Sequence, residues 1–98
     1  MNITSKQRAY LRSLANNLSP IYQIGKNGIS EKLIQGVSEA LEANELIKIT
    51  VLETAPEDAK ETAIKLSNNS NSVVVQVLGR KITLYRKRKK DSKISIDV

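Results

Sequence analysis

Hydrophobic residues along the chain alternate between helical spacing and strand spacing, which predicts a succession of short elements. Thr4 or Ser5 can cap a first helix that runs to about Asn17, and Ser19-Pro20 ends it. One face of this helix carries the apolar residues Tyr10, Leu11, Leu14, Ala15 and Leu18. Residues 21–24 are rich in strand formers and lead into the tight turn Gly25-Lys26-Asn27-Gly28.

A second helix and a second strand follow that turn. Ser30 is a good N-cap for a helix that ends near Asn44, and its apolar stripe consists of Leu33, Ile34, Val37, Ala40 and Leu41. Residues 46–52 alternate, with Ile47, Ile49 and Val51 on one face and Lys48 and Thr50 on the other. This strand is therefore expected to be buried mainly on one side, so that one face of the sheet stays open to solvent.

The last part of the chain predicts a helix and a hairpin. Pro56 fits the first turn of a third helix, whose packing positions are Ala59, Ala63, Ile64 and Leu66 and which closes in the polar stretch 67–71. Residues 72–78 and 81–86 are two strand-like runs, and Gly79-Arg80 between them suits a hairpin turn.

The predicted order α-β-α-β-α-β-β indicates a two-layer α/β (α+β) fold with a mixed four-stranded sheet. Right-handed crossovers place the second and third helices on the same sheet face, and the last strand runs antiparallel. We expect a single domain over residues 1–86, because 98 residues leave little room for a second core. Residues 87–98 are expected to form a basic tail, in which Ile94, Ile96 and Val98 suit either a short edge strand or a disordered end.

Composition removes many catalytic chemistries. The chain has no cysteine and no histidine, which excludes disulfides, thiol nucleophiles, and zinc or haem sites of the usual ligand types. Four acids lie close together in the sequence and could be considered as a magnesium site. Their spacing instead favours a role in stabilising the N-terminus of a helix, and they are Glu53, Glu57, Asp58 and Glu61. We therefore expect no enzyme, no cofactor and no small-molecule substrate. The absence of a long apolar run favours a cytoplasmic protein without a membrane partner.

The net charge of +6 is unevenly distributed. Residues 1–30 hold four bases and no acid, residues 31–68 hold four bases and eight acids, and residues 69–98 hold eight bases and two acids. Basic segments at both ends of the chain indicate an anionic partner, such as a nucleic acid or an anionic membrane surface.

The Gly25–Gly28 turn is the strongest candidate site. Both glycines can adopt backbone angles closed to other residues, so that another chain can approach the free amides. Lys26 adds a positive charge, and the amino-terminal end of the helix that Ser30 caps faces the same region. This arrangement predicts a clamp for sugar-phosphate backbone, to which Asn27 also belongs. The alternative is an ordinary turn between a strand and a helix.

Further basic side chains are candidates for phosphate contacts, because neutralising phosphates releases counterions. The run 86–90 is expected to keep its charges solvated, and a solubilising tail is its alternative role. A solvated helix face is the alternative for the first helix. Tyr85 could stack on one base or be a half-buried strand tyrosine. The candidates are Lys6, Arg8, Arg12, Arg80, Arg86, Lys87, Arg88, Lys89 and Lys90.

Several stretches together resemble the CRM domain in its bacterial stand-alone form, the YhbY-type RNA-binding proteins. They are residues 5–12, the segment from the first strand through Gly-Lys-Asn-Gly-Ile to Glu45-Leu46-Ile47-Lys48-Ile49, and the later segments 75–80, 84–86 and 93–95. The resemblance implies a fold similar to the C-terminal domain of translation initiation factor three. It also implies a Gly-x-x-Gly loop similar to that of KH domains, formed here by residues 25–28.

The family resemblance further implies association with precursors of the large ribosomal subunit, whereas related plant domains act in group II intron splicing. We therefore expect a non-catalytic, monomeric protein that clamps the backbone of rRNA during ribosome assembly. The alternative is a protein-interaction adaptor on ribosomal particles, in which the acidic middle of the chain makes the contact.

Overall fold

The computed structural model describes residues 2–89, 91, 92 and 94. Within them the elements follow the predicted order: α1 (Ser5–Ala15), β1 (Tyr22–Ile24), α2 (Glu31–Asn44), β2 (Leu46–Val51), α3 (Ala59–Ser70), β3 (Val73–Leu78) and β4 (Lys81–Tyr85). Apart from Ile94, the suggested edge strand at 94–98 lies outside the described residues, as does Lys90.

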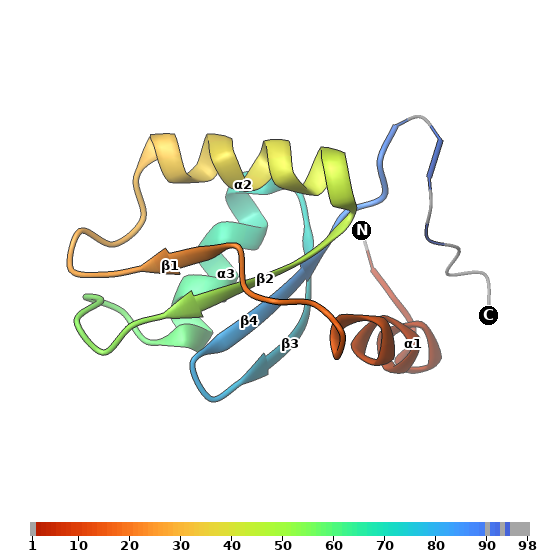
Figure 1. Cartoon of the computed structure of the whole chain (residues 1–98), viewed down its shortest axis with the longest axis horizontal. Helices are drawn as coiled ribbons and strands as arrows, with labels where there is room; N and C mark the ends of the chain where they lie inside the picture. The colour runs from red at the N-terminus through yellow and green to blue at the C-terminus, as the bar shows by residue number, and fades with distance from the viewer. Residues whose placement is uncertain (1, 90, 93, 95–98) are drawn as a thin grey trace.

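The strands form one mixed sheet in the order β1-β2-β4-β3. β1 and β2 are parallel, whereas β4 lies between β2 and β3 and is antiparallel to both. Helices α2 and α3 cover one face of the sheet, and α1 crosses one end of the other face (Figure 1). The fold class and the shared face of α2 and α3 are therefore as predicted.

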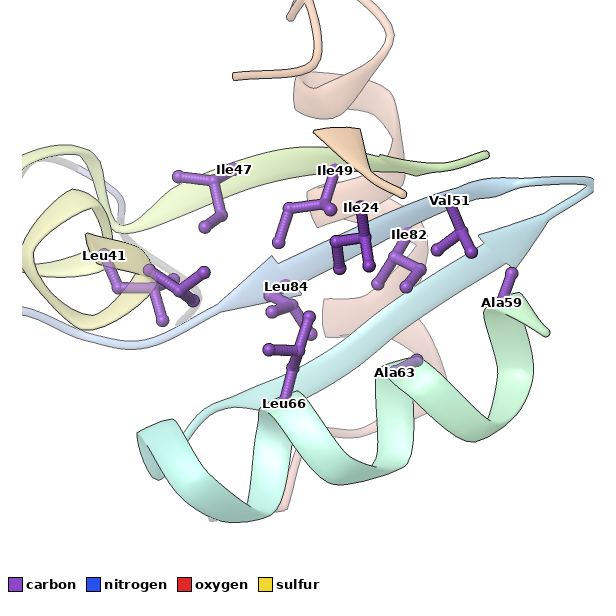
Figure 2. Packing of buried hydrophobic residues seen from close by; sticks show 11 residues of the cluster. Ile24, Leu41, Ile47, Ile49, Val51, Ala59, Ala63, Leu66, Ile82 and Leu84 are labelled. Carbon is purple, nitrogen blue, oxygen red and sulfur yellow. The ribbon is translucent and has the colours of Figure 1, made fainter. Parts of the chain in front are cut away.

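The main core lies between the sheet and the helices α2 and α3. Ile47, Ile49 and Val51 of β2 point to the same side as Ile82 and Leu84 of β4, as their alternation predicts. Figure 2 shows these side chains packed against residues of both helices, namely Leu41, Ala59, Ala63 and Leu66. Ile64 was expected in this core but is 51% exposed, because it lies on the solvent side of α3.

A second, smaller cluster lies under α1 on the opposite sheet face. Leu11 and Ala15 of α1 pack there against Leu46, Val75 and Tyr85. Tyr85 is fully buried, so it cannot stack on a base and the suggested stacking role is wrong. The sheet face is thus open only beyond the part that α1 covers.

Side-chain caps set the starts of the helices. Thr4 caps α1 in a capping box with Gln7, and Ser30 caps α2. Asp58 caps α3 through a hydrogen bond of 2.8 Å from the N–H of Glu61. The sequence predicts Pro56 in the first turn of α3. This prediction is wrong, because Pro56 lies in the loop before Asp58. No helix in the described part of the chain is long and apolar enough to cross a bilayer.

Candidate nucleic-acid interface

The Gly25–Gly28 turn follows β1 directly and is fixed at both ends. The N–H of Leu52 donates to the carbonyl of Ile24 at 2.9 Å, and the N–H of Gly28 donates to the carbonyl of Gly25 at the same distance. Lys26 and Asn27 lie between these anchors with exposed side chains. The turn therefore presents both side chains to solvent on a constrained backbone.

The two glycines of the turn have different requirements. Gly28 has a φ of +63°, and a Cβ atom there would lie 2.9 Å from Cγ of Pro56. Gly25 is not among the glycines with positive φ, and a Cβ there would make ordinary contacts with Thr54 and Leu52. Both glycines can adopt angles closed to other residues, and of the two only Gly28 does so.

The amino-terminal end of α2 lies directly beyond the turn. The hydroxyl of Ser30 accepts from the N–H of Leu33 at 3.1 Å, so this capping residue is occupied by the helix itself. Helix geometry leaves the N–H groups of Glu31 and Lys32 without intrahelical carbonyl partners, and these groups can meet an anion. The exposed carboxylate of Glu31 opposes the charges of Lys26 and Lys32 at this end.

Arg80 lies at the same end of the sheet as the Gly25–Gly28 turn. Its carbonyl accepts from the N–H of Val51 at 2.7 Å, next to the point where β1 and β2 end. Its guanidinium pairs with Glu53 at 2.8 Å, and both side chains are more than half exposed. The structure thus places residues 25–28, Ser30 and Arg80 at one end of the sheet, where the guanidinium of Arg80 is paired with the carboxylate of Glu53.

Arg8 and Arg12 of α1 have different surroundings. The guanidinium of Arg8 donates to the carbonyl of Val74 and, at 2.9 Å, to that of Val75, where β3 is irregular. Arg8 therefore holds α1 against β3, whereas Lys6 and Arg12 are exposed. Of the three basic candidates on this helix, Lys6 and Arg12 are therefore accessible to a ligand, whereas Arg8 has a structural role.

The basic run after β4 is partly structural. Arg86 donates to the hydroxyl and carbonyl oxygens of Ser38 at 3.0 and 2.7 Å and to the carbonyl of Ser70 at 2.7 Å, and it lies 3.6 Å from Glu42. Its side chain is only 20% exposed, so the expectation of solvated charges is wrong for Arg86. Lys87 and Lys89 are exposed, and Arg88 is half-buried.

The acidic residues near α3 have structural partners. Asp58 caps the helix, Glu53 pairs with Arg80, and Glu57 forms an ion pair with Lys65. The hydrogen bond to Glu57 raises the pKa of Lys65 above its usual value. No cluster of potential metal ligands occurs in the part of the chain that the structure describes.

The Gly25–Gly28 turn and the basic run lie at opposite ends of the sheet (Figure 1). The turn lies at the end of the sheet where β4 begins, and Arg86 follows the last residue of β4 at the other end. The 14 residues of α2 separate the same two ends by about 21 Å. The candidate residues therefore do not form one compact site.

Sequence reasoning missed two lysines on the open half of the sheet. Lys48 and Lys81 are on neighbouring strands and on the face opposite α2 and α3. The alternation of β2 already placed Lys48 beside Thr50, but the order of the strands, which brings β4 next to β2, cannot be read from alternation.

Comparison with known proteins agrees with this arrangement. The sequence profile of the CRS1/YhbY (CRM) domain matches residues 3–86, which include the Gly25–Gly28 turn and all seven elements. The chain belongs to the CRM domain family. This CRM domain is 43% identical over 94 residues to "Probable RNA-binding protein YqeI" of Bacillus subtilis, covering 96% of this chain and 98% of that protein.

Two further relatives of this CRM domain cover most of its length. A protein of Haemophilus influenzae named "RNA-binding protein" is 32% identical over 85 residues, covering 86% of this chain and 85% of that protein. The solution structure of SAV1595 from Staphylococcus aureus is similar with a TM-score of 0.80 and 47% identity, and the match covers 96% of this chain and 98% of that one. The sequence profile therefore shows the CRM family, and the solution structure shows the same fold.

Proposed function

We propose that this CRM domain is a non-catalytic RNA-binding protein that holds the RNA backbone at the Gly25–Gly28 turn. The observation that carries the proposal is the position of Lys26 and Asn27, which are exposed on a turn fixed by hydrogen bonds beside the amino-terminal end of α2. RNA binding appears in the printed names of the relatives from Bacillus subtilis and Haemophilus influenzae, which supports RNA as the partner.

The proposed RNA is rRNA in precursors of the large ribosomal subunit, bound by a cytoplasmic monomer during ribosome assembly. This choice of RNA rests on the resemblance to the YhbY-type proteins. Contacts to phosphate position a protein on its RNA without reading sequence, so a backbone clamp fits a protein whose target is selected by RNA shape.

The direct test is the double substitution Lys26→Asp and Asn27→Asp. Both side chains are exposed, so the domain should fold as before, while binding to labelled rRNA fragments should weaken. A matched control is Lys60→Asp with Asn68→Asp, which makes the same change in net charge on the exposed side of α3. Equal affinities of the two variants, with both folded, would refute the clamp.

The alternative function is an adaptor that binds a protein on ribosomal particles. The outer surfaces of α2 and α3 favour it, because they carry the exposed acids Glu31, Glu39 and Glu61. Complete ribonuclease digestion of a cell extract separates the two functions. Association that survives digestion supports the adaptor, whereas association that is lost with the RNA supports the clamp.

A further inference from the structure

The sheet face opposite α2 and α3 has a polar area that α1 leaves uncovered. In the register of the sheet, Gln23 lies beside Thr50 and Thr50 beside Lys81, while Lys48 lies beside Thr83 and Thr83 beside Gln76. The two rows run across the strands and are neighbours on this face of the sheet. Thr83 itself is buried. We call the five accessible residues the open sheet surface, made of Gln23, Lys48, Thr50, Gln76 and Lys81.

The open sheet surface carries hydrogen-bond donors and positive charge in a shallow, regular array. Gln23 and Lys81 are exposed, and Lys48, Thr50 and Gln76 are half-buried. Lys48 and Lys81 are diagonal neighbours on adjacent strands, so their Cα atoms are separated by about 7–8 Å. Two ammonium groups can therefore reach the same stretch of a polyanion.

Charge is separated between the two sides of the sheet. Helix α1 and the four strands contain no aspartate or glutamate, although they contain Lys6, Arg8, Arg12, Lys48 and Lys81. The helical layer has seven acids on or beside α2 and α3 against the three lysines Lys32, Lys60 and Lys65, and the acids are Glu31, Glu39, Glu42, Glu45, Glu57, Asp58 and Glu61. The potential over the open sheet surface is therefore positive, and an anionic partner is favoured there over the helical side.

Helix α1 adds a further cation at the border of this surface. Leu14 lies in an apolar groove with Leu46 and Ile94, toward the end of the sheet where the tail leaves. Arg8 and Arg12 are one turn apart on the other flank of α1, and Arg8 contacts β3 there. Arg12 is exposed and adds a cation on the helix that packs on this face of the sheet.

The open sheet surface is continuous with the Gly25–Gly28 turn. Gln23 is followed by Ile24, the residue that enters the turn, and Lys81 follows Arg80 at the same end of the sheet. A strand of RNA held at the turn can therefore continue across β1, β2 and β4 without meeting an acidic side chain of those strands.

The chemistry of this surface selects backbone contacts. Its side chains are amides, hydroxyls and ammonium groups, and the neighbouring Tyr85 is fully buried under α1. Such groups bind phosphate and ribose oxygens, whereas binding to bases of single strands usually needs aromatic stacking partners.

We propose that the open sheet surface is a second RNA-contact surface, which binds the sugar-phosphate backbone that continues from the Gly25–Gly28 turn. This inference rests on the RNA-binding function proposed above.

The test compares two charge-matched variants in binding to fluorescently labelled RNA of mixed sequence. Lys48→Gln with Lys81→Gln removes two charges from the open sheet surface, and Lys60→Gln with Lys65→Gln removes two from α3. Because each lysine that contacts a phosphate contributes about 1 to the slope of log affinity against log salt, the first variant should lower the slope by about 2. The control should leave the slope nearly unchanged.

The outcomes separate this inference from the proposed function. Failure of the unsubstituted chain to bind RNA overturns both. If Lys26→Asp with Asn27→Asp weakens binding while the sheet variant behaves like its α3 control, the clamp stands and the second surface is refuted. Thermal unfolding checks that each variant folds. If the double sheet variant does not fold, Lys81→Gln alone replaces it, because Lys81 is exposed. This single variant is expected to lower the slope by about 1, and an unchanged slope refutes the second surface.

Discussion

Gly28 faces the ring of Pro56 so closely that a Cβ atom on Gly28 would lie 2.9 Å from Cγ of the proline. This contact joins the Gly25–Gly28 turn to the loop between β2 and α3. Together with the φ of +63°, it excludes any side chain at position 28 without rearrangement. The shape of the turn therefore depends on a residue almost thirty positions away in the sequence.

The first prediction concerns this contact. Gly28→Ala should destabilise the domain by about 2–4 kcal/mol, because backbone strain and overlap with Pro56 act together. Gly79→Ala is the matched control, since Gly79 has a φ of +59° and nothing within 4 Å of its added Cβ, and it should cost about 1 kcal/mol. Chemical denaturation measures both. Equal losses would show that the proline contact is unimportant.

The second prediction separates stability from binding in the basic run. Arg86→Ala should lower the free energy of unfolding by about 2 kcal/mol, because the partly buried guanidinium donates to Ser38 and Ser70. Lys87→Ala, at an exposed neighbour, should change it by less than about 0.5 kcal/mol. A stability unaffected by loss of Arg86 would contradict its structural role and return it to the candidate RNA contacts.

The third prediction applies the same comparison to α1. Arg8→Ala should cost about 1–2 kcal/mol of stability, because it removes the hydrogen bonds to the carbonyls of Val74 and Val75. Arg12→Ala should leave stability within about 0.5 kcal/mol and weaken RNA binding at low salt. Denaturant titration and fluorescence anisotropy measure the two effects. The reverse pattern would mean that Arg8, and not Arg12, faces the ligand.

The fourth prediction concerns the buried carboxylate of Glu45 at the end of α2. Its oxygens accept hydrogen bonds from the N–H of Arg88 at 3.3 Å, the N–H of Ile94 at 3.2 Å and the hydroxyl of Ser92 at 2.7 Å. Glu45→Gln replaces one accepting oxygen by a donor. Amide exchange at Arg88 and Ile94 should then become about ten-fold faster, equivalent to about 1.4 kcal/mol.

A control for Glu45 is Glu39→Gln on the exposed side of α2, which makes the same chemical change away from the tail. Hydrogen exchange followed by NMR should show no change at Arg88 or Ile94 in that variant. Identical exchange in the two variants would show that Glu45 does not anchor the segment after β4.

Local patterns predicted the elements of this fold because the information lies within a few residues. Ser30 marks the start of α2, and the alternation of Ile47, Ile49 and Val51 identifies the buried face of β2. The start of α3 was misplaced because Pro56 and Asp58 are both acceptable near a helix N-terminus. Asp58 is the residue that has the extended backbone of a cap and accepts the capping hydrogen bond from the N–H of Glu61.

The candidate site was predictable only in part, because it depends on contacts between distant segments. A run of basic residues reads as solvated, yet Arg86 is held by Ser38 and Ser70, which come from two different helices. β4 lies beside β2 and antiparallel to it. The basic run therefore leaves the sheet at the end opposite the Gly25–Gly28 turn, and Lys81 lies beside Thr50. No local pattern contains that strand order.

The most direct test of the RNA-contact surface is an NMR titration of the isotope-labelled chain with rRNA fragments, followed through the backbone amides. Amide signals of Lys26, Asn27 and Lys81 should shift first, and those of Lys60 and Ile64 on the outer side of α3 should stay unchanged. Shifts concentrated on α3, with the Gly25–Gly28 turn and the open sheet surface unaffected, would contradict RNA binding at the turn and the open sheet surface.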